Sequence, residues 1–171
     1  VCIVGAGQSD RATRFMAAVP AGRHRYAILC RPDQIADAQG ALLLGAGELL
    51  SSPLSPQQVV GAAIRCSRPG PAPHDSISGL PLLDDSEAPS SFTDIFAAPK
   101  PGEHPIEAAL LLRKFLRGWD EVGGDGRGGV RARLAAGPEE AARVVERLGW
   151  VLGSTFRLEP ARDHLLSRRL G

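Results

Sequence analysis

The sequence has few aromatic residues and no excess of either charge. Aromatic side chains make up 5% of the 171 residues, too few for the row of stacking platforms on which single-stranded nucleic acids are bound. Twenty basic residues against 19 acidic residues give a formal net charge of +1. A chain so balanced lacks the broad basic field that attracts nucleic acids. Both shortages predict that no nucleic acid polymer is a partner.

Cysteines, long apolar runs and metal-ligand patterns are also scarce. Cys2, Cys30 and Cys66 are odd in number and widely separated, which predicts reduced thiols and no metal site. No apolar run approaches the roughly 18 residues of a membrane span, and no secretory signal is recognised. We therefore expect a cytoplasmic protein without membrane insertion or metal, beginning inside a longer polypeptide because position 1 is valine. The histidines share no ligand spacing: His24, His74, His104 and His164.

The first 66 residues alternate between short apolar runs and helical patterns. Continuous apolar runs are typical of parallel strands covered on both faces by helices. Alternation of the two patterns predicts a layered α/β domain. The expected strands are 1–4, 26–30 and 48–50, and the expected helices are 11–19, 32–44 and 56–65.

A segment rich in proline and serine, residues 67–104, separates this region from a second one. Its seven prolines before position 102 predict a linker or loops, with one short helical turn at 92–96. The second region, 105–171, is also expected to be α/β. Its predicted elements are a helix at 105–119, a glycine-rich turn at 123–129, a strand at 130–135, a helix at 138–148, a strand at 150–158 and a basic helix at 161–170.

Residues 45–54, with the sequence GAGELLSSPL, resemble the end of a response-regulator receiver domain. In receivers a Gly-Ala pair precedes the last strand and Lys-Pro follows it. The resemblance implies a flavodoxin-like parallel sheet over residues 1–66. Gly45 suits a helix end with positive φ, and Pro53 is placed where a cis peptide is expected.

The phosphorylation chemistry of a receiver is missing from the matching positions. Ser52 stands where the resemblance requires a lysine, Cys30 where it requires threonine or serine, and Gly5 where it requires the phosphoacceptor aspartate. Without a carboxylate nucleophile no aspartyl phosphate forms, so the resemblance implies a pseudo-receiver lacking its first strands. An unrelated small α/β domain remains an alternative. A dinucleotide-binding turn at Gly5–Gly7 fails because its third glycine would fall at Asp10.

A second resemblance, to diguanylate cyclase (GGDEF) domains, covers the rest of the chain. Residues 75–80, DSISGL, are similar to the entry segment D-x-L-T-G-L of that family, although Leu82 and Leu83 replace its Asn-Arg pair. The signature itself is changed to Gly126, Arg127, Gly128, Gly129 and Val130. Without acidic residues the turn cannot hold Mg²⁺ through carboxylates, so cyclase activity is not expected.

Five residues before that signature, Arg117 and Asp120 have the R-x-x-D spacing of the inhibitory site at which the family binds cyclic di-GMP. An arginine fork pairs with phosphate or with guanine O6 and N7, and a carboxylate accepts from the guanine N–H edge. Trp119 is expected in the core, with stacking on a base as the alternative. The resemblance further implies a contact from Arg147 on the next helix, and Arg143 lies one turn earlier on the same face.

Together the two resemblances imply a non-catalytic cyclic di-GMP effector without a cofactor. Like receiver–GGDEF regulators, it would act through protein partners or adaptors in bacterial signalling and cell-cycle control, with recruitment to a cell pole. Whether it forms a homodimer is left open. Three alternatives also stay open: an exposed Arg117–Asp120 ion pair worth a few tenths of a kcal/mol, a ligand-free scaffold that uses helix 56–65, and a residual diguanylate cyclase.

Overall fold

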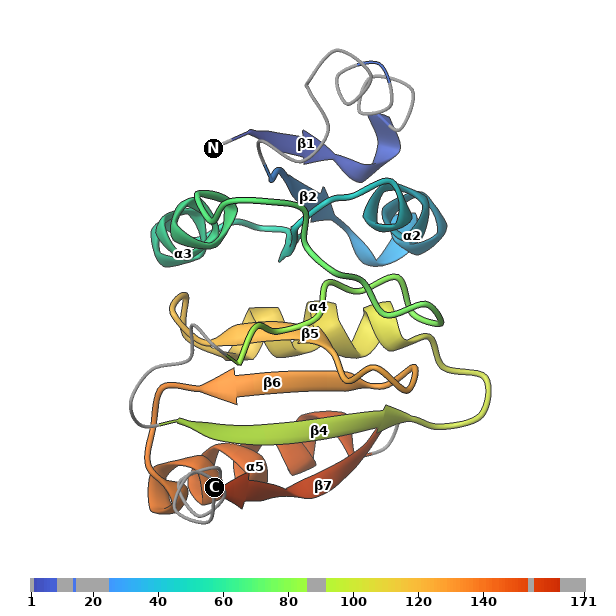
Figure 1. Cartoon of the computed structure of the whole chain (residues 1–171). Helices are drawn as coiled ribbons and strands as arrows, with labels where there is room; N and C mark the ends of the chain where they lie inside the picture. Colours follow the sequence, from blue (N-terminus) through green and yellow to red (C-terminus); the bar gives the residue numbers. More distant parts are fainter. Residues whose placement is uncertain (1, 9–13, 15–24, 86–91, 154–155, 164–171) are drawn as a thin grey trace.

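The computed structural model describes residues 2–8, 14, 25–85, 92–153 and 156–163. Two β-sheets stack with a helix between them (Figure 1). The mixed α/β character expected from the sequence is confirmed. Within the described part of the chain, none of the helices has the length and apolar character needed to cross a membrane.

The first sheet is parallel and has three strands in the order β1-β2-β3. Helix α2 covers one face, where Ile28 and Leu49 enter the main core, and α3 covers the other, where Leu50 meets Ala62. Successive residues of a strand point to opposite faces. Because helices cover both faces of this sheet, consecutive strand residues are apolar. The elements are β1 (Ile3–Gly5), β2 (Ala27–Cys30), α2 (Ile35–Leu43), β3 (Glu48–Ser51) and α3 (Pro56–Cys66), with 3-10 turns at Ala6–Gln8 and Pro32–Gln34.

The second sheet is antiparallel and has four strands in the order β5-β6-β4-β7. Its elements follow one another as β-α-β-β-α-β, the split βαβ arrangement. That arrangement serves many unrelated functions, so it does not by itself indicate one. The elements are β4 (Thr93–Pro99), α4 (Pro105–Phe115), β5 (Glu121–Gly124), β6 (Val130–Leu134), α5 (Pro138–Leu152) and β7 (Phe156–Asp163).

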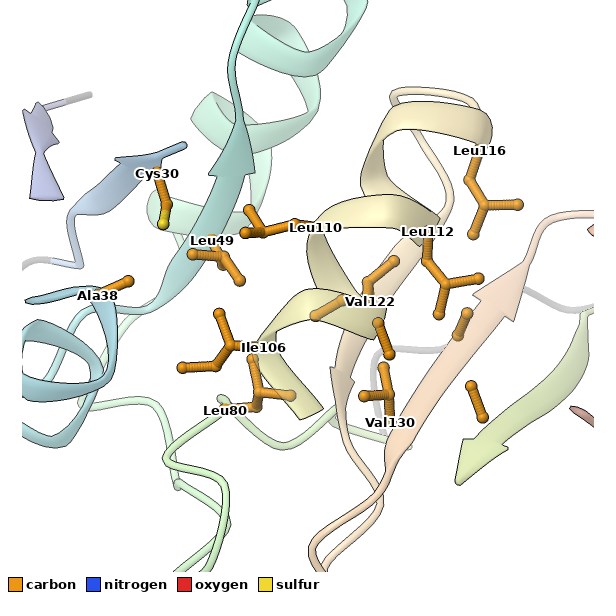
Figure 2. Close-up of a cluster of buried hydrophobic side chains, with 14 of the residues drawn as sticks. Cys30, Ala38, Leu49, Leu80, Ile106, Leu110, Leu112, Leu116, Val122 and Val130 are labelled. Carbon is orange, nitrogen blue, oxygen red and sulfur yellow. The ribbon is translucent and has the colours of Figure 1, made fainter. Parts of the chain in front are cut away.

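Helix α4 lies between the two sheets and joins their cores (Figure 1). Figure 2 shows Ile106 and Leu110 near Leu49 of the parallel sheet, and Leu112 near Val122 and Val130 of the antiparallel sheet. A helix that contacts two layers must be apolar around most of its circumference, in contrast to the single stripe of a surface helix. The sequence ALLLRKF at 109–115 supplies that breadth.

The largest correction concerns residues 67–104, which were expected to be a linker with a helical turn at 92–96. They contain β4, an inner strand paired with both β6 and β7. The helical interpretation was wrong because Thr93, Ile95 and Ala97 are buried at alternate positions of an extended strand. Proline does not interrupt this strand, since Pro99 is its last residue.

Three smaller boundaries also differ from expectation. The helix predicted to reach Trp119 ends at Phe115, because Leu116 adopts an extended conformation. Trp150 lies in the last turns of α5, so the strand expected at 150–158 begins only at Phe156. Residues 161–163, expected in a basic helix, belong to β7, and the remainder of that tail lies outside the described residues. The helix expected at 11–19 also lies outside them except for Arg14.

Several local predictions are confirmed. Gly45 adopts a φ of 107° at the end of α2, and the Ser52–Pro53 peptide bond is cis. The helix expected from residue 56 begins there as α3. The Ser55 hydroxyl oxygen accepts the N–H of Gln58, and the Gln58 side-chain oxygen accepts the N–H of Ser55.

Candidate functional site

Asp120 holds the loop between α4 and β5 from inside the protein. Its Oδ2 accepts the main-chain N–H of Arg117 at 3.0 Å, and its Oδ1 accepts the N–H of Ala135 at 3.1 Å. The residue is only 2% exposed. The expected contact of this carboxylate with a guanine edge therefore gains no support. Asp120 fixes the position of Arg117.

Arg117 and Trp119, in contrast, reach the surface from the same loop. The Arg117 guanidinium lies 5.5 Å from the centre of the Trp119 ring, within the range of a cation–π contact. Its Nη1 also lies 3.0 Å from Glu140 Oε1 on α5. Trp119 was expected in the core, but 54% of it is exposed, because Gly118 rather than Trp119 packs against α3.

The two arginines predicted on the following helix lie beside this loop. Arg147 donates from Nη2 to the main-chain oxygen of Phe115 at 3.4 Å, at the end of α4. Arg143 is exposed and shares a helix face with Glu140 and Arg147, since they are three and four residues apart. We call the set Arg117, Trp119, Arg143 and Arg147 the arginine cluster. Arg117 thus reaches α5 through Glu140, and Arg147 of α5 reaches the end of α4, whereas the fourth predicted ligand residue, Asp120, is buried.

The entry segment and the altered signature, which are far apart in the sequence, are held together by Asp75. Its Oδ1 accepts the N–H groups of Ile77 and Ser78 at 2.8 and 2.9 Å, and its Oδ2 accepts the N–H of Gly128 at 3.1 Å. Burial raises the pKa of the Asp75 carboxyl, but the main-chain donors outweigh burial and leave the pKa below its usual value. Asp75 is therefore an ionised anchor for the signature turn.

The signature turn itself is closed by Asp125, a residue that sequence reasoning had not selected. Its Oδ1 accepts the N–H groups of Arg127 and Gly129 at 2.7 and 2.8 Å. Gly126 and Gly128 take φ values of 78° and 89°, whereas Arg127 needs no positive φ. The Asp-Gly pair at 125–126 was an available signal for such a turn. Val130 starts β6 and is buried.

No group of three His, Cys, Asp or Glu side chains that could hold a metal ion occurs among the described residues. The hydrogen bonds of the signature turn show that its neighbouring carboxylates bind the main chain. The Asp125 carboxylate accepts main-chain N–H groups of the turn itself. The Asp75 carboxylate, from the entry segment, likewise accepts the N–H of Gly128.

The three positions predicted to form a degenerate phosphoacceptor pocket lie at one edge of the parallel sheet. Gly5 ends β1, Cys30 ends β2, and Ser52 follows β3, whose register pairs Ser51 with Cys30. The Cys30 thiol donates to the main-chain oxygen of Arg31. Burial, with smaller effects from Asp33 and Asp37, raises its pKa to about 11. Cys30 is therefore a protonated thiol at neutral pH.

A buried ion network, also unanticipated, connects the parallel sheet to the arginine cluster. Glu48 of β3 binds Arg65 of α3 with an Nε–Oε2 distance of 2.5 Å and also pairs with Arg113 of α4. Arg113 donates to the main-chain oxygen of Asp120 at 2.8 Å. Burial lowers the pKa of Arg113 to about 10, against the opposing effect of Glu48. In the sequence, Glu48 and Arg113 each stand within a run of apolar residues. That position was the available signal that their charges are buried.

A second ionic layer covers the face of the antiparallel sheet away from its helices. Arg131 Nε lies 2.6 Å from Asp94 Oδ2 across the β4–β6 pair. Arg133 is 1% exposed and stacks over Phe92 at 4.5 Å. Its Nη1 also reaches Glu121 of β5 at 3.3 Å. Because these arginines are paired with carboxylates of the sheet and with Asp85 beside it, we assign this layer a structural role.

Comparison of the chain with protein-family models, with curated proteins and with solved structures found no match. The assignment of function therefore rests on the geometry of the site and on the sequence resemblances.

Proposed function

We propose that this protein is a non-catalytic receptor for cyclic di-GMP and that the arginine cluster binds the dinucleotide. The observation that carries the proposal is that the loop with Arg117 and Trp119 lies beside α5, the helix of Arg143 and Arg147. Arg117 reaches Glu140 of that helix, and Arg147 reaches the Phe115 oxygen at the end of α4. Three guanidinium groups and an exposed indole on one surface suit a ligand with two phosphodiester charges and two flat bases. The proposal follows the sequence resemblance to GGDEF domains and rests on it for the identity of the ligand.

Each residue has a distinct role in the proposed complex. Arg117 and Arg147 would pair with phosphate oxygens or with guanine O6 and N7, as planar donor forks do. Trp119 offers a face on which a guanine can stack, with an energy of about 1–3 kcal/mol in comparable base–aromatic contacts. Asp120 would keep Arg117 in place through the main chain. Glu140 would have to release Arg117 as the phosphate approaches.

The signal would leave the site through the buried ion network. The loop that carries Arg117 is tied to Arg113 by the Asp120 carbonyl and, through Arg113, to Glu48 of the parallel sheet. A ligand that binds one position of this loop more tightly shifts the conformational equilibrium of the protein toward that position. In this proposal, protein partners or adaptors in bacterial signalling recognise the ligand-bound arrangement, and recruitment to a cell pole follows from them.

Calorimetric titration tests the proposal. We expect cyclic di-GMP to bind the wild-type chain with a measurable heat. Arg117→Ala and Arg147→Ala should each weaken it by at least about tenfold, since a charged hydrogen bond is worth about 1.5–3 kcal/mol. Arg31→Ala, which removes an exposed arginine that pairs with Asp33 two residues away, should bind normally. No heat, or equal weakening by all three variants, contradicts the proposal. Incubation with GTP and Mg²⁺ should yield no cyclic product.

A ligand-free scaffold is the second candidate, and one observation favours it. Val60 and Ile64 are 60% and 61% exposed on the outer face of α3. Ile64 and Trp119 line the same small cavity of about 130 Å³. Exposed apolar residues that adjoin one another are typical of protein-binding surfaces. Val60→Asp/Ile64→Asp variants that lose partner capture while the wild type binds no cyclic di-GMP would establish the scaffold instead.

A further inference from the structure

The cavity that Ile64 and Trp119 border lies between α3 and the antiparallel sheet. Three parts of the chain line it: α3 with the turn after it, the loop between α4 and β5, and strands β5 and β6. The larger side chains of its lining are Ile64, Arg65, Arg68, Trp119, Glu121 and Arg133. Its volume of about 130 Å³ is close to that of apolar cavities of about 150 Å³ that admit a benzene ring.

Guanidinium groups outnumber carboxylates on the walls of this cavity. Arg65, Arg68 and Arg133 line it together with one carboxylate, that of Glu121. This carboxylate is shared, since its Oε1 lies 2.6 Å from Arg68 Nη2 and its Oε2 lies 3.3 Å from Arg133 Nη1. Arg65 and Arg133 also pair with carboxylates outside the lining, those of Glu48, Asp85 and Asp94. The walls therefore favour an anion over a cation.

Arg65, which is only 6% exposed, gives a second and independent indication of a ligand. Its Nε pairs with Glu48 Oε2 at 2.5 Å, and its Nη1 donates to the Gly118 oxygen at 3.1 Å. Its Nη2 is buried as well, but it has no hydrogen-bond acceptor among the residues that the structure describes. Buried N–H donors normally have a partner, because leaving one unsatisfied is costly. An acceptor atom on a molecule in the cavity would satisfy this nitrogen.

The apolar part of the lining indicates that the anion carries an apolar body. Ile64 and Trp119 border the cavity, and more than half of each is exposed to solvent. Covering such side chains with apolar surface is favourable, and a flat ring can lie against the indole of Trp119. A bare phosphate or sulfate ion would leave both side chains in contact with water.

We propose that this cavity binds a small aromatic carboxylate. One carboxylate oxygen would accept from Arg65 Nη2, and the ring would pack against Ile64 and Trp119. Hydrogen bonds between a guanidinium and a carboxylate are about twice as strong as those between neutral groups. The site is separate from the arginine cluster, although Trp119 borders both, and binding at it does not depend on cyclic di-GMP.

Three probes with the same ring and different charges test the proposal. Benzoate, benzamide and benzylamine are titrated into the ¹⁵N-labelled 171-residue chain, and the indole N–H signals of its two tryptophans are followed by NMR. Trp150, 88% exposed on α5, serves as the internal reference. We expect benzoate to shift the Trp119 signal only and to bind at least about tenfold more tightly than benzamide, the ratio that one charged hydrogen bond provides. Equal affinity for benzoate and benzamide, tighter binding of benzylamine, equal shifts of both tryptophans, or no Trp119 shift at millimolar benzoate overturns the proposal.

Matched variants locate the carboxylate. Arg65→Lys should reduce the affinity for benzoate to about that for benzamide, because it keeps a positive charge beside Glu48 but removes Nη2. Arg31→Lys makes the same replacement at an exposed position and should leave the affinity unchanged. Equal benzoate affinity of Arg65→Lys and the wild type overturns the proposal, and the wild-type comparison of the three probes stands even if Arg65→Lys folds poorly. Cyclic di-GMP is titrated separately, so failure of this site is distinguished from failure of the arginine cluster.

Discussion

Gly61 of α3 lies so close to Gly118 that a Cβ added to Gly61 would stand 1.9 Å from the Gly118 carbonyl oxygen. The contact continues on the other side, where a Cβ on Gly118 would meet the Gln57 oxygen at 2.2 Å. Arg65 donates to the same Gly118 oxygen at 3.1 Å. Two glycines therefore let α3 dock directly on the loop that presents Arg117 and Trp119.

That contact predicts a sharp contrast between two Gly→Ala variants. Gly61→Ala should lower the free energy of unfolding by about 1–3 kcal/mol or more, because backbone must move to admit the methyl group. Gly40→Ala is the control: it lies in α2, where an added Cβ meets nothing within 4 Å. It should stabilise the protein by about 0.5–1 kcal/mol. Urea unfolding measures both, and equal stability of the two variants would contradict the docking described.

Asp75→Asn tests the anchor between the entry segment and the signature turn. At pH 7 the variant should be about 1–3 kcal/mol less stable, because the amide cannot accept all three N–H groups and its own NH₂ would face a donor. The folded-state pKa of Asp75 is below its usual value. Its stabilising effect is therefore full above the unfolded-state pKa of about 3.9 and is lost as pH falls through the folded-state pKa.

The difference in unfolding free energy between wild type and Asp75→Asn should accordingly be constant from about pH 7 to 5 and shrink below about pH 4. Exposed Asp37→Asn provides the comparison and should show little change at any pH. A wild-type advantage that grows on acidification would reverse the sign argued here and refute the anchor.

Glu140→Gln should strengthen cyclic di-GMP binding if the arginine cluster is the site. Glu140 competes with a phosphate for Arg117, and its removal leaves the guanidinium with the longer contact to Asp120, at an Nε–Oδ2 distance of 3.5 Å. Because this pair is largely exposed, we expect a gain of only about two- to fivefold. Glu139→Gln removes the same charge from the neighbouring position and should change affinity less. Calorimetry compares the two, and weaker binding by Glu140→Gln would argue against displacement.

Cys30 and Cys66 should resist alkylation in the folded protein. Burial raises the pKa of each thiol to about 11, so at pH 8 only about one molecule in a thousand carries the reactive thiolate. With iodoacetamide, mass spectrometry should find these two positions unmodified under native conditions and modified in urea. Rapid native labelling of either one would show that the parallel sheet opens.

The sequence by itself determined those helices, strands and turns that neighbouring residues in the chain specify. Alternating apolar runs and helical patterns located the central strands and helices, and the helix expected from residue 56 begins there as α3. Gly45 was expected at a positive φ, as it is. The sequence also indicated which arginines to examine near the signature. In the structure Arg117 contacts Glu140 of α5, the helix that carries Arg143 and Arg147.

Only the tertiary structure decided which side chains are accessible. Asp120 was expected to face a ligand and Trp119 the core, yet Asp120 is buried against main-chain N–H groups and Trp119 is exposed. Strand β4 escaped detection because its stability comes from pairing with β6 and β7. Burial, strand pairing and the ion network of Glu48 are set by residues distant in the chain. No pattern in a short window of sequence contains them.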